Sequence, residues 1–171
     1  MKKIVVIGPE STGKSTLSRQ LADALGTQWV PEYAREYLEQ LARPYEEADL
    51  LQIAKGQLRS EDEQAMKAGT LLVCDTDLQV VRVWSEHRYD RCHKWILEAI
   101  ARRRYDLYLL TNIDVAWEED PLREHREHSQ RHYFYNIYRD IVQQSGLPWA
   151  DISGGQKERL ERALEAIRNN T

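Results

Sequence analysis

The sequence has few cysteines, no long hydrophobic run and no excess of positive charge, and each absence excludes a class of protein. Only Cys74 and Cys92 are cysteines among 171 residues, which excludes a disulfide framework and favours the cytoplasm. No apolar run approaches the roughly 18 residues that a membrane-spanning helix needs. The formal net charge of -4 disfavours nucleic acid as a partner. We therefore expect a cytoplasmic protein that binds neither membranes nor nucleic acid.

The chain also lacks internal repeats, low-complexity tracts and linkers, so we expect residues 1–171 to form a single domain. Short apolar runs such as KIVVIG, TLLVCDTD and DLYLLTN alternate with stretches of helical periodicity. This alternation is typical of βαβ units, and continuous apolar strands are typical of a parallel sheet covered on both faces. We predict a three-layer α/β fold with about five parallel strands, including one long helix between Pro44 and Ala68 despite Gly56.

The first apolar run leads into GPESTGKST, which matches the pattern GxxxxGK followed by Ser or Thr. A strand before this motif and an amphipathic helix after it predict the phosphate-binding loop of a P-loop NTPase fold, with amides and a helix N-terminus facing the phosphates. Lys14 would bind the β- and γ-phosphates, and Ser15 would coordinate Mg²⁺. We predict ATP and Mg²⁺ as cofactors, with the nucleotide bound by Gly8, Glu10, Ser11, Thr12, Gly13, Lys14, Ser15 and Thr16.

Three acidic residues follow predicted strands, at the edge where open α/β sheets bind ligands. Asp75 would hold Mg²⁺ together with Ser15; the alternative is capping of the next helix, a role for which Asp77 is better placed. Glu32, in PEYAREY, is the candidate base for an alcohol acceptor, and Asp77 would bind substrate hydroxyls, although these two acids could exchange roles. For Glu32 and Arg35 a surface cluster of ion pairs is the alternative.

The segment of about residues 115–135, VAWEEDPLREHREHSQRHYFY, carries arginines behind a proline and is predicted to be a helical lid. Arg123 would stabilise charge on the transferred phosphoryl group, and Arg126 would contact the triphosphate. Solvent-exposed helical arginines would look the same in sequence. Tyr33, Arg35 and Trp117 are predicted to bind the substrate, with Trp117 stacking on a ring, whereas Trp84 is assigned to the core.

The motifs GPESTGKST, EYAREY, VCDTD and DPLRE occur in the order of the ribosylnicotinamide kinase domain of NadR-type proteins, which the chain resembles over nearly its whole length. The resemblance implies a P-loop nucleoside kinase fold and MgATP-dependent phosphorylation of the 5′-hydroxyl of nicotinamide riboside, giving nicotinamide mononucleotide for NAD synthesis. It assigns site roles to Lys14, Ser15, Glu32, Asp75, Asp77 and Arg123. The chain has no room for the nucleotidyltransferase domain of NadR-type proteins, so we do not expect adenylylation.

The chain departs from the family pattern at Pro31, where the resemblance implies an aromatic residue that stacks on the pyridine ring. Trp29 or Trp117 could replace that aromatic face. No lysine follows DLYLLTN as in the guanine-reading element of GTPases, which favours ATP. We therefore predict an ATP-dependent phosphotransferase with an alcohol acceptor, first nicotinamide riboside and alternatively another nucleoside or metabolite. A regulatory ATPase or nucleotide switch that acts through a protein partner is the alternative from another class.

Overall fold

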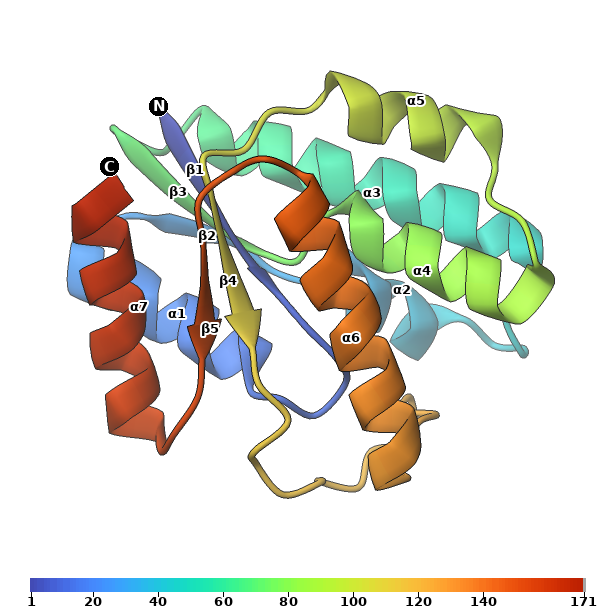
Figure 1. Ribbon diagram of the computed structural model, residues 1–171. Coiled ribbons are helices and arrows are strands. Elements are labelled where there is room, and N and C mark those ends of the chain that lie inside the picture. Colours follow the sequence, from blue (N-terminus) through green and yellow to red (C-terminus); the bar gives the residue numbers. More distant parts are fainter. Residues whose placement is uncertain (171) are drawn as a thin grey trace.

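The structure is a computed structural model that describes residues 1–170, and a parallel sheet lies at its centre (Figure 1). The five strands within these residues are β1 (Lys2–Ile7), β2 (Gln28–Val30), β3 (Leu71–Asp75), β4 (Leu107–Thr111) and β5 (Trp149–Ile152). Their order is β2-β3-β1-β4-β5, and every neighbouring pair is parallel. All strands therefore end at the same edge of the sheet, and the predicted fold class is confirmed.

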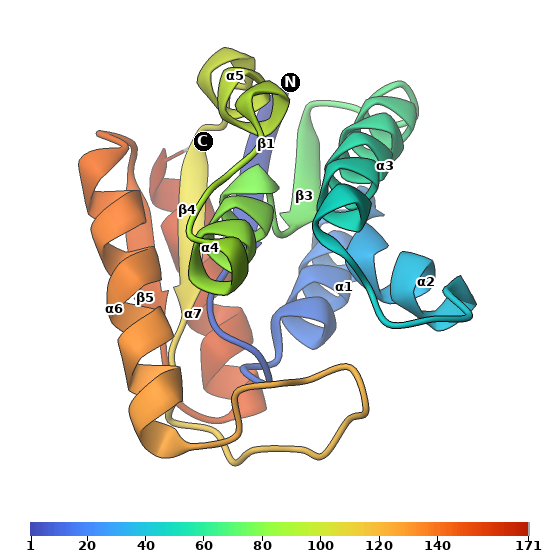
Figure 2. The ribbon, with the colours of Figure 1, turned by 90° about the vertical axis from the view of Figure 1, so that its right-hand side faces the viewer.

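The helices complete the three layers. Residues 1–170 contain α1 (Lys14–Leu25), α2 (Tyr33–Gln40), α3 (Glu47–Ala65), α4 (Leu78–Tyr89), α5 (Lys94–Arg102), α6 (His128–Gln144) and α7 (Gln156–Asn170). Helices α1 and α7 cover one face of the sheet, and α3, α4 and α6 cover the other (Figures 1 and 2). None of the helices in this part of the chain combines the length and the apolar character needed to cross a membrane.

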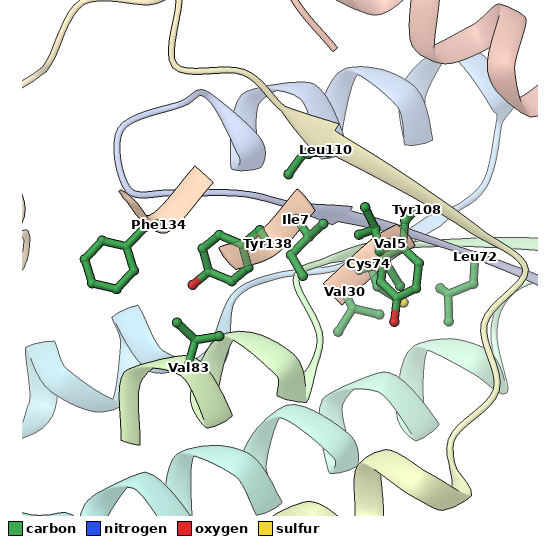
Figure 3. Close-up of a cluster of buried hydrophobic side chains, with 11 residues drawn as sticks. Val5, Ile7, Val30, Leu72, Cys74, Val83, Tyr108, Leu110, Phe134 and Tyr138 are labelled. Atoms are coloured by element: carbon green, nitrogen blue, oxygen red, sulfur yellow. The ribbon is translucent and has the colours of Figure 1, made fainter. Parts of the chain in front are cut away.

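The central strand β1 is apolar throughout because it is buried on both faces. Ile4 and Val6 pack against α1 and α7, whereas Val5 and Ile7 face the opposite layer. Figure 3 shows this second cluster, in which Ile7 lies near Tyr138 of α6. Burial of each such side chain contributes about 1.5–3 kcal/mol. This core holds the carboxyl edge of the sheet, where the predicted site residues lie.

Helix α3 runs without a break through Gly56, as predicted. A Cβ atom on Gly56 would lie 2.0 Å from Cε1 of Tyr33, which comes from α2. Glycine is needed here because the tyrosine ring packs directly on the α3 backbone. The close approach fixes α2, and with it the start of α2 at the sheet edge.

The segment between β4 and α6 differs from the predicted helical lid. Residues 112–127, named here the β4–α6 loop, contain turns and no helix, and α6 starts at His128. Pro121 disfavours helical backbone at the residue before it, and the acidic run before the proline has no apolar face to bury. Figure 2 shows the loop crossing the end of the sheet beside the start of α1.

Candidate active site

The turn from β1 into α1 has the shape of a phosphate-binding loop. Its backbone has positive φ at Gly8 (152°), Ser11 (55°) and Gly13 (77°), a conformation that glycine adopts without strain. A Cβ atom on Gly8 would lie 2.3 Å from Thr111 Oγ1, so only glycine lets the loop approach the end of β4. In the described part of the chain no side chain caps α1. The first amides of α1 are therefore free to bind an anion.

Short hydrogen bonds fix the loop. Thr12 Oγ1 donates to the Pro9 carbonyl oxygen at 2.8 Å and lies 2.7 Å from Thr111 Oγ1. Lys14 Nζ also donates to the Pro9 carbonyl oxygen, at 2.8 Å. The ammonium group therefore lies over the loop, where it can exchange a carbonyl partner for phosphate oxygens.

Arg159 of α7 joins three segments of the site, a role that was not predicted from the sequence. Its guanidinium donates to the carbonyl oxygens of Thr12 at 2.7 Å, Asn112 at 2.9 Å and Gly154 at 2.8 Å, and it pairs with Asp114. The residue is only 5% exposed, which is rare for arginine unless every donor is used. Arg159 thus fixes the phosphate loop, the end of β4 and the turn before α7 relative to one another.

A cleft of about 770 Å³ opens beside the phosphate loop. It brings together most of the predicted site residues: Gly8, Glu10, Ser11, Thr12, Gly13, Lys14, Ser15, Thr16, Glu32, Arg35 and Arg123. The rest of the lining is rich in rings, and we name Tyr45, Trp84, His87, His125 and Phe134 the aromatic pocket. The cleft therefore joins a phosphate cradle to an apolar surface of the kind that binds small organic molecules.

The rings of the aromatic pocket contact one another across several elements. Tyr45 and Trp84 meet edge to face with centroids 4.9 Å apart, and Trp84 Nε1 donates to Tyr45 Oη at 3.1 Å. Phe134 of α6 lies 4.9 Å from His87 of α4 and 4.4 Å from His125 of the β4–α6 loop. Trp84 packs against the core cluster formed by α3, α4 and α5, as predicted, and it also lines the cleft, which was not predicted. Its spacing from His87 on one face of α4 was the available signal.

Asp75, at the end of β3, is fully buried, and neither carboxylate oxygen has a hydrogen-bond partner among residues 1–170. Burial raises the pKa of Asp75 to about 7, the negative charge of Glu32 adds to the shift, and the Ser15 side chain and Lys14 ammonium oppose it. An unpaired buried carboxylate is costly unless a cation compensates it. The Ser15 hydroxyl and the Asp75 carboxylate are the oxygen ligands that Mg²⁺ prefers, so these residues fit the predicted metal.

Glu32 and Arg35 both lie at the cleft. Glu32 precedes the first turn of α2, and its side chain makes no capping hydrogen bond there. Arg35 Nη2 forms an ion pair with Asp120 Oδ2 of the β4–α6 loop at 2.9 Å. The carboxylate of Glu32 is therefore available to a ligand, whereas Arg35 is engaged with the loop that covers the cleft.

Asp77 and Tyr33 were predicted to bind substrate but lie outside the cleft lining. Asp77 is buried; it caps α4 by accepting from the Gln79 amide at 3.0 Å and accepts from Tyr108 Oη at 2.8 Å. This confirms its capping role and leaves its carboxylate occupied. Tyr33 packs on Gly56 of α3 instead of turning toward the cleft. Sequence spacing placed both residues near the sheet edge but could not give the direction of either side chain.

Of the predicted site residues on the β4–α6 loop, some line the cleft and others lie outside it. Arg123 lines the cleft, whereas Trp117 lies outside its lining, and the guanidinium groups of Arg123 and Arg131 each lie 5.9 Å from the centroid of its ring. Arg126 points away and pairs with Glu119 at 2.9 Å, with the two side chains 75% and 71% exposed. Trp117 thus contacts one arginine of the loop and one of α6, and Arg126 is a surface residue.

The comparisons with known proteins agree with this geometry. Residues 3–159 match the family AAA_28, described as an AAA domain. The trifunctional NAD biosynthesis/regulator proteins NadR of Escherichia coli K12 and Salmonella typhimurium LT2 are each 25% identical to the chain over 175 residues. These alignments cover 98% of this chain and 42% of each relative, so the chain spans less than half the length of the curated relatives it matches.

Solved structures show the same relationship. A NadR protein in complex with NR superimposes with a TM-score of 0.82 at 24% identity, over 99% of this chain and 49% of that chain. A NadR protein with NAD and AMP-PNP gives 0.80 at 25% identity, with the same coverage. Deoxyadenosine kinase from M. mycoides, with dCMP and dCDP bound, shares the fold with a TM-score of 0.62 at 14% identity, over 98% of this chain and 99% of that chain.

The resemblance to NadR-type proteins that the sequence motifs indicated is thus confirmed over nearly the whole chain. The fold is that of the P-loop kinases, with the phosphate loop, the orphan Asp75 carboxylate and the cleft at one edge of the sheet. Because the family model spans most of its length, the chain belongs to the AAA_28 family of P-loop AAA domains.

Proposed function

We propose that the protein is a MgATP-dependent kinase that phosphorylates the 5′-hydroxyl of nicotinamide riboside to give nicotinamide mononucleotide. The observation that carries the proposal is the cleft, which joins a phosphate loop to a pocket of aromatic rings with a free carboxylate, Glu32, in the same lining. A switch that transfers phosphate only to water needs the phosphate loop but not the rings. The similarity to NadR proteins, one of them solved with NR bound, supports this acceptor.

At the donor side the chain's own residues would bind and orient ATP. The loop amides and Lys14 would hold the β- and γ-phosphates, and Arg123 would approach the transferred group from the β4–α6 loop. Ser15 and Asp75 would hold Mg²⁺, which would supply positive charge to offset that of the phosphates. We also propose that residues 1–171 act as a single kinase domain and that the β4–α6 loop is its lid.

At the acceptor side the aromatic pocket suits a pyridinium ring. Rings attract an aromatic cation through their π faces, and the Glu124 carboxylate, which also lines the cleft, adds a negative charge. Glu32 would accept the proton from the 5′-hydroxyl as its oxygen attacks the γ-phosphorus. Since Pro31 offers no ring and Trp29 packs against the sheet, Trp84 is our candidate for the stacking face.

ATP turnover measured alone and with a panel of nucleosides tests the function. We expect turnover to require an added nucleoside, with nicotinamide riboside the best acceptor and a 5′-phosphorylated product identified by mass. A neutral nucleoside such as adenosine or cytidine should be a poorer acceptor because it lacks the positive charge. Equal turnover without any acceptor, or turnover that needs a protein partner, would establish the regulatory ATPase instead.

Glu32→Gln is expected to lower kcat by ~10²-fold or more while ATP affinity changes little, because the amide keeps the size of the carboxylate but cannot accept the proton. Steady-state kinetics and ATP titration measure the two quantities. Glu36→Gln, one turn further along α2 and exposed, is the matched control. An unchanged kcat in Glu32→Gln would remove Glu32 from the role of base.

Arg123→Ala is expected to lower kcat by ~10²-fold because it removes a charge from the cleft side of the lid, whereas Arg126→Ala should retain nearly full activity. The two arginines belong to the same loop, and only the direction of the side chain separates them. Paired kinetics of the two variants test the assignment. Equal losses in both variants would show that Arg123 acts only through the general charge of the loop.

A further inference from the structure

Glu10 places a carboxylate on a loop whose amides are shaped to bind phosphate, an arrangement that repels a polyphosphate unless the carboxylate has another role. Its Oε2 atom accepts two consecutive backbone N–H groups of the β4–α6 loop, those of Glu124 and His125, each at 3.0 Å. Hydrogen bonds to an ionised acceptor are stronger than those between neutral groups. The contact therefore joins the phosphate loop to the lid at one atom.

The two residues held by Glu10 both belong to the acceptor side of the cleft. The Glu124 carboxylate accepts from Tyr45 Oη at 2.9 Å. The His125 ring lies 4.4 Å from Phe134 and 5.4 Å from His87, between centroids. Fixing these two amides fixes where both side chains enter the aromatic pocket.

Other contacts hold the lid elsewhere, so the contribution of Glu10 can be separated from theirs. Ser11 Oγ accepts from the Glu118 amide at 2.9 Å and from Arg123 Nη1 at 3.3 Å. Arg131 Nη2 donates to the Ser11 carbonyl oxygen at 3.2 Å. These bonds secure Glu118, the Arg123 side chain and α6, whereas Glu10 alone among the phosphate-loop side chains of residues 1–170 accepts from the backbone N–H groups of Glu124 and His125.

We propose that Glu10 is a positioning residue. It holds Glu124 and His125 of the β4–α6 loop, which line the acceptor side of the cleft, on the phosphate loop. The affinity for the acceptor therefore depends on a residue of the ATP site. This inference rests on the proposed function, because it assigns the aromatic pocket to the phosphoryl acceptor. Without the two hydrogen bonds, Glu124 and His125 are released from the pocket and water enters beside the γ-phosphate. Acceptor binding weakens, and a larger share of the γ-phosphoryl groups of ATP is transferred to water, which leaves ADP and phosphate.

The test compares Glu10→Ala, which removes both bonds, with Glu10→Gln, whose amide oxygen can still accept two N–H groups without the charge. Hydrogen exchange at the amides of residues 124 and 125 reports on the bonds without any reaction. For Glu10→Ala we expect ~10-fold or faster exchange and a ~10-fold higher KM for nicotinamide riboside, with ATP affinity nearly unchanged. Because Glu10→Gln keeps both contacts but loses the charge, both measurements should fall between those of the wild type and Glu10→Ala. Glu119→Ala, an exposed acid of the same lid, is the matched control.

The outcomes separate this inference from the proposed function. Unchanged exchange in Glu10→Ala, or faster exchange with an unchanged KM, overturns the positioning role, and so does a Glu10→Gln variant as impaired as Glu10→Ala. If the wild type phosphorylates no nucleoside, the proposed function fails. Glu10 then has no acceptor to position, so its proposed role fails as well, even if hydrogen exchange confirms the two bonds. Glu10→Asp, one methylene too short to reach both amides, replaces Glu10→Ala if the alanine variant does not fold.

Discussion

Asp75→Asn is expected to make the Mg²⁺-free protein more stable at neutral pH and to abolish its ATP turnover. The carboxylate is fully buried and has no hydrogen-bond partner among residues 1–170, so its charge opposes folding until a cation binds. Asparagine fills the same space without a charge, but it is a weaker ligand for Mg²⁺. Stability and activity should therefore change in opposite directions, as expected for a residue retained for function.

The pH dependence follows from the pKa of Asp75, which burial raises from 3.8 to about 7. The folded protein then binds a proton more tightly than the unfolded chain, so its stability falls as pH rises from about 4 to about 7. The asparagine side chain of the Asp75→Asn variant cannot ionise, so the variant lacks this loss. At ~1.4 kcal/mol per pKa unit, the free energy of unfolding of Asp75→Asn should exceed that of the wild type by on the order of 2–4 kcal/mol above pH 7. Below pH 4 this difference vanishes.

Urea unfolding in EDTA between pH 4 and pH 8 measures this difference, and ATP turnover with Mg²⁺ measures the loss of activity. Asp140→Asn is the matched control, because that aspartate is exposed on α6 and its substitution removes a carboxylate without relieving a buried charge. An Asp75→Asn variant no more stable than the wild type at pH 8 would contradict the account of the buried charge. Retained turnover would remove Asp75 from the metal site.

The parts of the molecule that the sequence predicts are those determined locally. The phosphate loop is read from Gly8, Gly13 and Lys14 because its backbone needs glycine at fixed positions and a helix directly after it. Asp75 is placed by the end of a continuous apolar strand. In each case a few neighbouring residues are enough to predict the feature, and the prediction does not depend on how distant segments pack.

The parts that could not be predicted depend on which way a side chain turns within an element that was itself predictable. Tyr33 begins α2 beside Glu32, but Gly56, distant in sequence, offers the close contact that takes its ring away from the cleft. Trp84 packs on the core and also lines the cleft, where its ring meets Tyr45, a residue distant in sequence. Arg159 escapes prediction because, apart from Asp114, its partners are carbonyl oxygens, which any sequence supplies.

Lys14→Ala is expected to lower kcat/KM by ~10³-fold or more, which corresponds to about 4 kcal/mol of transition-state stabilisation. The ammonium group carries the full positive charge of the phosphate loop, and the neighbouring amides offer only partial charges. Its partner in this structure is the Pro9 carbonyl oxygen, a single bond of a partly exposed group. Its loss should therefore change the free energy of unfolding by no more than ~1 kcal/mol.

Two further variants separate the charge of Lys14 from its geometry. Lys14→Arg keeps the charge on a planar, bulkier group that does not fit a loop built for a point charge, so most of the activity should still be lost. Lys157→Ala, at a side chain 88% exposed on α7, controls for the loss of one positive charge. Steady-state kinetics with thermal unfolding of all three variants measures both quantities. If Lys14→Ala retained turnover, the phosphate loop would bind its anion through backbone amides alone, and the charge needed by the transferring phosphoryl group would have to come from Arg123.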